Sequence, residues 1–126
     1  MAAAAIIETT RLRLHEFVEG SAEEAAFILE LLNDPGFLRF IGDRGVHDLA
    51  QAHAYLLNGP ISSYRNRGFG MYRIEEQSSG RSIGVCGLIK RDTLDDVDLG
   101  YALLAGACGQ GYASEGSAAA IDWAFD

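Results

Sequence analysis

The chain has 126 residues, of which 48% are hydrophobic and 22% charged, and its formal net charge is −8. This length fits a single domain with a real core, and the composition is typical of a globular protein rather than a disordered or membrane-spanning one. Because phosphate backbones are bound by basic surfaces, the acidic balance argues against nucleic acid as a partner. It favours a cationic ligand such as an amine, although solubility alone would also explain it.

The cysteines and the N-terminus bear on the cellular setting. Cys86 and Cys108 have neither metal-ligand spacing nor the pattern of a disulfide framework, so we expect no metal and a reducing, cytoplasmic environment. Residues 1–7 are apolar but lack the basic segment of a signal peptide. No apolar run reaches the roughly 18 residues that a membrane helix needs. We therefore expect a cytoplasmic protein that does not use a membrane.

The first half of the chain is predicted to be mainly helical. Residues 11–17 alternate between apolar and polar, which is the pattern of a half-buried strand. Ser21 and Glu24 have the spacing of a capping box, and Pro35 follows the helix that they begin. The predicted helices run over residues 22–33, from the Asp48 cap to the Gly59-Pro60 break, and over a short turn at 60–67.

After Gly68 the pattern changes from a helical period to strands. Residues 69–76 and 82–90 are predicted to pair antiparallel through a short polar loop, and residues 97–104 form a third strand. The last helix is predicted over residues 112–125, where small residues allow close packing on a sheet. The predicted fold class is α+β: a strand, two or three helices, three antiparallel strands and a final helix.

The segment Ala107–Glu115 lies between the last strand and the last helix and contains Gly109 and Gly111. Glycine lets the backbone bend sharply and approach a ligand closely, because it has no Cβ. The first amides of the following helix lack partners, and the helix dipole favours an anion there. The segment therefore predicts a cradle for a phosphate group that is held by backbone amides.

Two other phosphate-binding motifs fit this segment poorly. A Walker loop needs Gly-Lys-Ser/Thr, whereas Gly111 is followed by Tyr112 and Ala113. A dinucleotide-binding G-x-G-x-x-G needs glycine or alanine where Ser114 stands, and its acidic partner would fall beyond Asp126. Neither motif is supported.

The segment resembles the acyl-coenzyme A pyrophosphate loop of the GCN5-related N-acetyltransferases, the GNAT superfamily. Their pattern, Gln/Arg-x-x-Gly-x-Gly/Ala, falls on residues 108–113, with Cys108 standing at the Gln/Arg position. The continuation Gly-Tyr-Ala-Ser-Glu is similar to the branch that includes the ribosomal-protein N-terminal acetyltransferases. Three further segments also resemble motifs of this family, in the same order. They are the opening segment Thr9-Thr10-Arg11-Leu12 and the strands at residues 82–88 and 97–104.

The resemblance implies a GNAT-like mixed sheet in one domain over residues 1–126. In the family a fifth strand, a fourth helix and two more strands follow the helix of the pyrophosphate loop. The cofactor lies where the fourth and fifth strands splay apart. We therefore expect the chain to contain the N-terminal part of the fold, with one wall of the cofactor site.

The resemblance also assigns the cofactor residues. Acetyl-coenzyme A (acetyl-CoA) is the implied co-substrate, and no metal is implied. The strand end supplies backbone hydrogen bonds to the pantetheine and thioester, and the glycine turn holds the pyrophosphate through its amides. The residues in these positions are Leu103, Leu104, Ala105, Gly109, Gln110, Gly111, Tyr112, Ala113 and Ser114.

Candidates for the acid/base step are fewer. Asp98 matches an acidic position of the family strand and could orient a water or contact the amine, although a solvated carboxylate explains it equally well. Core packing is expected for Tyr101, and Glu115 is expected to complement the helix dipole. Cys108 could be a nucleophile at a helix N-terminus, but a small loop-filling residue is the simpler interpretation. Surface or capping roles are expected for His15, His47 and His53.

Three functions follow from these observations. The first is acetyl-CoA-dependent transfer of an acetyl group to a primary amine of a small molecule or a protein N-terminus. The second is a truncated, non-catalytic relative that acts by association, for example as a homodimer that pairs through the exposed edge of strand 97–104. The third is a generic anion-binding α/β domain.

Overall fold

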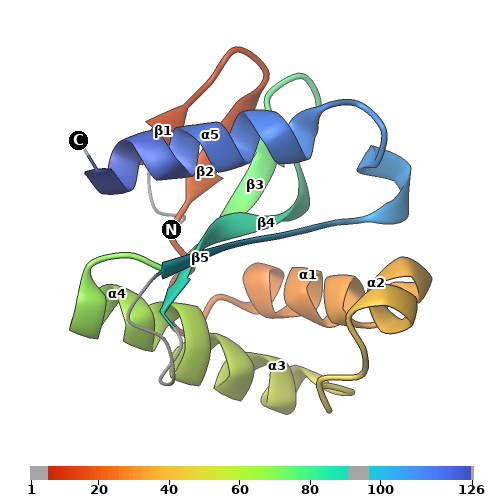
Figure 1. The fold of residues 1–126 in the computed structure, drawn as a ribbon. Coiled ribbons are helices and arrows are strands. Elements are labelled where there is room, and N and C mark those ends of the chain that lie inside the picture. Colours follow the sequence, from red (N-terminus) through yellow and green to blue (C-terminus); the bar gives the residue numbers. More distant parts are fainter. Residues whose placement is uncertain (1–5, 91–96, 126) are drawn as a thin grey trace.

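The computed structural model describes residues 6–90 and 97–125, which form an antiparallel sheet between two helical layers (Figure 1). The strands pair in the order in which they occur along the chain. They are β1 (Ile7–Glu8), β2 (Leu12–His15), β3 (Met71–Glu76), β4 (Arg81–Lys90) and β5 (Val97–Leu103). The helices are α1 (Ala22–Leu32), α2 (Pro35–Phe40), α3 (Leu49–Leu56), α4 (Ser62–Arg67) and α5 (Tyr112–Phe125).

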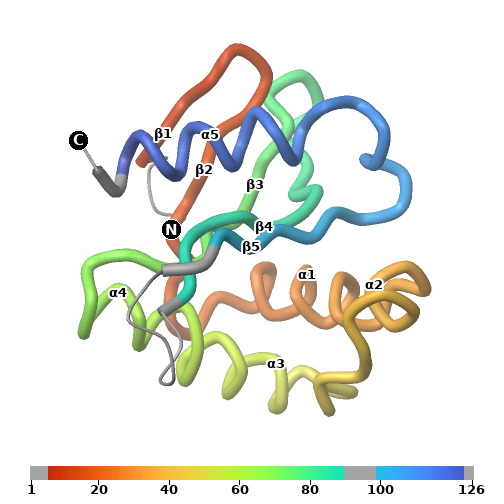
Figure 2. The backbone as a smooth tube through the Cα atoms, in the orientation of Figure 1, coloured from red at the N-terminus to blue at the C-terminus, as the bar shows by residue number. Residues whose placement is uncertain are grey.

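The two faces of the sheet are covered by different parts of the chain. Figure 2 shows α5 running across one face, whereas α1 to α4 lie together against the other. Neighbouring residues of a strand point to opposite faces, so Val85 joins the core under α1 to α4 and Cys86 joins the core under α5. Each layer thus has its own apolar cluster, and burial of both clusters stabilises the fold.

The α+β prediction is confirmed, and the later elements begin and end within two residues of their predicted bounds. Helix α2 was not predicted. Asp34 caps it by accepting a hydrogen bond from the Gly36 amide at 2.9 Å, and Pro35 occupies the first helical position. Proline stops α1 from continuing but is well suited to begin a helix, because its missing amide has no partner there in any case.

The prediction that Gly59 and Pro60 end the helix that begins at the Asp48 cap is wrong. A π-helical turn, Leu57–Ile61, carries the chain through Pro60 into α4, and the Ser62 amide donates to the Leu57 carbonyl five residues earlier. In an α-helix the proline ring would clash with the carbonyl four residues back. The wider π turn accommodates the ring, so α3 and α4 are joined without a break.

Two pairs of charged or ionisable side chains, one between α1 and β3 and one between β2 and β3, lie inside the fold. The predicted capping box is only half formed: Ser21 accepts from the Glu24 amide, but the Glu24 carboxylate accepts from the Val18 amide and from Arg73 at 3.1 Å. The surface or capping role expected for His15 is also wrong. His15 is buried in β2, and its Nε2 lies 2.7 Å from Glu75. Both pairs connect strands or helices that are distant in sequence.

The structure also bears on membranes and metals. Within residues 6–90 and 97–125, none of the helices has the length and apolar character needed to cross a membrane. The same residues contain no group of three or more His, Cys, Asp or Glu side chains placed to hold a metal ion.

Candidate functional site

The glycine turn predicted to bind phosphate joins β5 to α5 by way of a short 3₁₀ turn, Ala105–Ala107. Gly109 and Gly111 have φ angles of +81° and +78°, in the left-handed region that side chains disfavour. The first helical hydrogen bond of α5 runs from the Glu115 amide to the Gly111 carbonyl at 3.1 Å. The amides of residues 112–114 therefore lie ahead of the hydrogen bonding of the helix itself and form a donor cluster at its positive end.

The side chains of this loop divide into inner and outer groups. Tyr112 is buried against the sheet and donates its hydroxyl to Glu76 at 2.8 Å. Gly109, Gln110 and Ser114 are exposed. Tyr112 can therefore offer a ligand its backbone amide but not its side chain, and the loop presents mainly backbone groups to the solvent.

A cluster of three side chains, which we call the Arg11 clamp, binds this loop on the side that faces the N-terminal segment. It consists of Thr9, Arg11 and Glu115, and it connects the N-terminal segment to α5. The Arg11 amide and Nε donate to the two Glu115 carboxylate oxygens at 3.0 and 2.7 Å, and the Thr9 hydroxyl donates to the same carboxylate. The Arg11 guanidinium also lies 4.4 Å from the centre of the Tyr112 ring.

The clamp fixes the orientation of the loop backbone. Arg11 Nη1 donates to the Gln110 carbonyl at 2.7 Å. In a planar trans peptide the carbonyl and the following N–H point in opposite directions, so the Gly111 amide points away from Arg11. The clamp thereby turns one more backbone donor towards the open side of the loop.

Electrostatics keep the clamp charged. Burial alone would raise the pKa of Glu115, but the hydrogen bonds from Thr9 and from Arg11 outweigh it, and the pKa is lowered. The expected role of Glu115 as a partner of the helix dipole is thus incomplete, because its carboxylate also holds a segment more than a hundred residues earlier in the chain. The Thr-x-Arg-Leu opening was the only sequence signal that could have indicated this contact.

The end of β5 provides one set of exposed backbone groups. The Leu104 amide donates to the Ile83 carbonyl at 2.8 Å, and the Ala105 amide donates to Asp34 at 3.3 Å. Since hydrogen-bonding residues alternate in an antiparallel pair, the backbone groups of Leu103 and Tyr101 face away from β4. Among the described strands none pairs with this edge of β5. Of the three predicted strand-end residues, Leu103 therefore has the most accessible backbone.

The remaining candidates are spread over the structure. Asp98 pairs with Ile89 in the β4–β5 ladder, but its side chain lies outside the described part. The core role expected for Tyr101 is wrong, because its side chain is 57% exposed. Cys108 is exposed, with its Sγ 3.6 Å from the Leu104 carbonyl oxygen.

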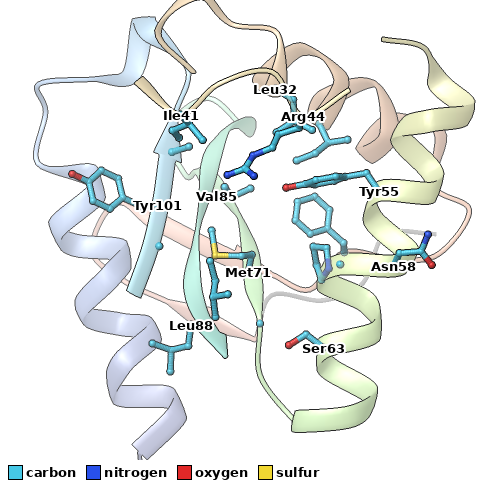
Figure 3. Close-up of a pocket in the computed structure, with 18 of the residues that line it drawn as sticks. Leu32, Ile41, Arg44, Tyr55, Asn58, Ser63, Met71, Val85, Leu88 and Tyr101 are labelled. Atoms are coloured by element: carbon cyan, nitrogen blue, oxygen red, sulfur yellow. The ribbon is translucent and has the colours of Figure 1, made fainter. Parts of the chain in front are cut away.

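A pocket of about 380 Å³ lies on the other face of the sheet, between β3 to β5 and helices α1 to α4 (Figure 3). Its walls are mostly apolar. Gly100, Tyr101 and Ala102 line it from β5, the strand that leads into the glycine turn. Sequence reasoning did not find this pocket, because its residues come from helices, loops and strands far apart in the chain.

Comparison with known proteins identifies the family. Residues 11–126 match the model of the acetyltransferase (GNAT) domain. The chain belongs to the GNAT acetyltransferase family. This membership makes it an N-acetyltransferase by family and supports acetyl-CoA as the acetyl donor. Among curated proteins, none matches the chain in sequence.

Solved structures share the fold. An acetyltransferase from Agrobacterium tumefaciens C58 is 24% identical, with a TM-score of 0.71 over 100% of this chain and 69% of its own. A GNAT-family acetyltransferase from Bacillus anthracis is 16% identical, with a TM-score of 0.71 over 94% and 65%. RimL, a ribosomal L7/L12 α-N-protein acetyltransferase in complex with coenzyme A, is 20% identical, with a TM-score of 0.74 over 95% and 67%. The chain thus spans about two thirds of the length of each.

Proposed function

We propose that this protein transfers an acetyl group from acetyl-CoA to a primary amine of a small molecule or a protein N-terminus. The observation that carries the proposal is the backbone donor cluster at the start of α5, held open by Gly109 and Gly111. An anion bound there needs no lysine, because main-chain amides and the helix dipole supply the attraction. A pyrophosphate has the charge and the acceptor oxygens that such a cluster favours.

The loop is suited to a bulky anion. A Cβ added at Gly111 would lie 3.4 Å from Arg11 Nη2, and the backbone there has a positive φ, so a side chain would both strain the turn and press on the clamp. At Gly109 a Cβ would meet nothing within 4 Å, so φ alone favours glycine. Glycine at these two positions allows the positive φ angles that give the turn its shape.

The chemistry requires orientation more than covalent help from the protein. Acetyl-CoA supplies an activated carbonyl on which a deprotonated amine forms a C–N bond as the C–S bond breaks. The amides of residues 111–114 would hold the pyrophosphate, and the free backbone groups of Leu103 would align the pantetheine along β5. Asp98 is the proposed group for contacting the amine or an ordered water.

The test is a calorimetric titration with coenzyme A, beside ATP and inorganic phosphate. We expect coenzyme A to bind and Gly111→Val to abolish that binding, since a β-branched residue is disfavoured at the positive φ of this turn and its side chain meets Arg11 of the clamp. Gly80→Val is the matched control, because Gly80 also has a positive φ, +71°, but lies in the β3–β4 hairpin. No heat with millimolar coenzyme A, or full affinity in Gly111→Val, would overturn the proposal.

Association is a second candidate function. Its support is the edge of β5, where Leu99 and Tyr101 are 44% and 57% exposed. Unpaired strand edges favour pairing with another chain. Light scattering would detect a homodimer, and Tyr101→Lys should dissociate it; a monomer at all concentrations would count against this candidate. We also place the protein in the cytoplasm, because neither Cys86 nor Cys108 is in a disulfide.

A further inference from the structure

The pocket on the helical face has an apolar interior. Its floor comes from the sheet and its wall from α1 and the segment before it, and the side chains that enclose it include Phe17, Ile28, Leu32, Met71, Val85 and Leu88. A space of about 380 Å³ falls in the range of pockets that hold small molecules. The interior would therefore favour the aliphatic or aromatic part of a ligand over a fully polar one.

The polar groups of the pocket converge on one place. Figure 3 shows the Arg44 guanidinium and the Tyr55 hydroxyl pointing into the space between the sheet and α3. Burial raises the pKa of Tyr55, and the charge of Arg44 offsets only part of this, so the hydroxyl remains a hydrogen-bond donor at neutral pH. A donor and a cation next to an apolar surface suit a ligand that carries a carboxylate.

The charge of the pocket is opposite to that of the chain. The net charge is −8, yet the lining residues in the described part include Arg44 and no Asp or Glu. Among the described residues, no carboxylate forms an ion pair with Arg44. The guanidinium is also exposed, so a ligand that enters from the solvent meets it first.

We propose that this pocket binds the acceptor, and that the acceptor is an apolar α-amino acid whose carboxylate pairs with Arg44 and Tyr55. The inference rests on the proposed acetyl transfer and specifies its substrate class. The α-amine would attack the acetyl carbonyl of the donor, so that a C–N bond forms and the C–S bond breaks. The proton lost by the amine goes to the departing thiolate, and the products are an N-acetyl amino acid and the free thiol of coenzyme A. Gly100, Tyr101 and Ala102 connect the pocket to the β5 edge at Leu103, which would align the donor.

This assignment disfavours other amines. A polyamine would bring several positive charges to Arg44, and like charges repel. An amino acid amide would keep the apolar group but lose the ion pair. A peptide N-terminus has no carboxylate next to its amine.

The test begins with binding of L-leucine and L-phenylalanine, measured by calorimetry without coenzyme A. We expect both amino acids to bind, leucinamide to bind at least about tenfold more weakly, and spermidine not to bind. Arg44→Gln should weaken leucine binding by about tenfold or more, and Arg44→Lys should restore part of it. Arg39→Gln is the matched control, because Arg39 lies on α2 beside Phe40 and does not line the pocket.

A transfer assay completes the test. With acetyl-CoA, Arg44→Gln should raise the KM for leucine by the same factor and leave the affinity for coenzyme A unchanged. Leucinamide, spermidine or a peptide N-terminus proving the better ligand would overturn the substrate class, as would unchanged leucine binding in Arg44→Gln. Loss of coenzyme A binding with leucine binding retained would instead count against the proposed acetyl transfer alone.

Discussion

The two faces of the sheet carry candidate ligand sites that are built from different groups. On the α5 face, the candidate anion site consists of backbone amides shaped by two glycines and held by the Arg11 clamp. On the helical face, the pocket consists of side chains from many elements, with Arg44 and Tyr55 as its polar groups. A site made of main chain can persist through extensive sequence change, whereas a site made of side chains changes with each substitution.

The largest expected difference concerns the two cysteines: Cys86 lies on β4 in the core under α5, and Cys108 lies in the loop that precedes α5. Burial raises the pKa of Cys86 to about 12, so roughly one thiol in ten thousand is ionised at pH 8. Cys108 is exposed beside the loop. We expect iodoacetamide to label Cys108 at least about a thousandfold faster than Cys86, as followed by peptide mass spectrometry.

The same experiment tests whether the loop is the anion site. Coenzyme A should slow labelling of Cys108, and leucine should not, because leucine is proposed to bind on the other face. Cys108→Ser supplies the control for background labelling. Rapid labelling of Cys86 would show that α5 does not cover the sheet as described.

The next effect concerns the stability of the helical face. Glu24→Ala would leave the charge of buried Arg73 without its carboxylate, with only the Ser82 hydroxyl as a side-chain partner, and we expect the free energy of unfolding to fall by about 3 kcal/mol. Glu19→Ala removes the exposed partner of Arg65 and should change it by less than about 1 kcal/mol. Urea denaturation measures both. Equal effects of the two substitutions would contradict the burial of the Glu24 pair.

A smaller effect, on the affinity for coenzyme A, is expected when the Arg11 clamp is weakened. Glu115→Gln keeps the shape of the side chain but removes the charge that holds Arg11, so the Gln110 carbonyl is less firmly oriented. We expect the Kd for coenzyme A to rise about tenfold by calorimetry. Leucine affinity should not change, and Glu8→Gln, which alters an exposed pair with Arg13, should affect neither ligand. A change in leucine affinity would show that the two faces are not independent.

The smallest effect is a pH dependence of stability. The folded-state pKa of Glu115 lies below its unfolded value of about 4.3. Its contribution is therefore fully present above that unfolded value and is lost as the pH falls through the lower folded value. The thermal unfolding midpoint of the wild type should fall more steeply below about pH 4.5 than the midpoint of Glu115→Gln. Parallel profiles for the two proteins would contradict the role of the clamp.

Sequence alone predicted the features that depend on neighbouring residues. The strands from β3 onward, helix α5 and the turn at Gly109 and Gly111 follow from local periodicity and from glycine placement, and the resemblance then named the family. Pro60 misled the prediction, because proline usually ends a helix and only the geometry of the wider turn shows how the chain continues.

Contacts over long sequence separations could not be predicted. The Arg11 clamp joins residues 104 positions apart, and apart from the Thr-x-Arg-Leu opening neither partner has a pattern that points to the other. The pocket poses the same problem, since Arg44 follows α2, Tyr55 lies on α3 and Met71 on β3. Such sites depend on how the elements pack, and a single sequence does not specify that packing in its local patterns.

The Arg11 clamp has a consequence for the N-terminal end of the sheet. Thr9 and Arg11 lie between β1 and β2, so the segment that joins these strands is fastened to the loop that is proposed to bind coenzyme A. The coupling is reciprocal: a ligand that orders the loop also orders this hairpin. Fraying of the hairpin lowers the affinity for the ligand by the same factor by which the ligand stabilises the hairpin. Coenzyme A should thus slow amide hydrogen exchange in residues 6–15, far along the chain from any atom that it touches.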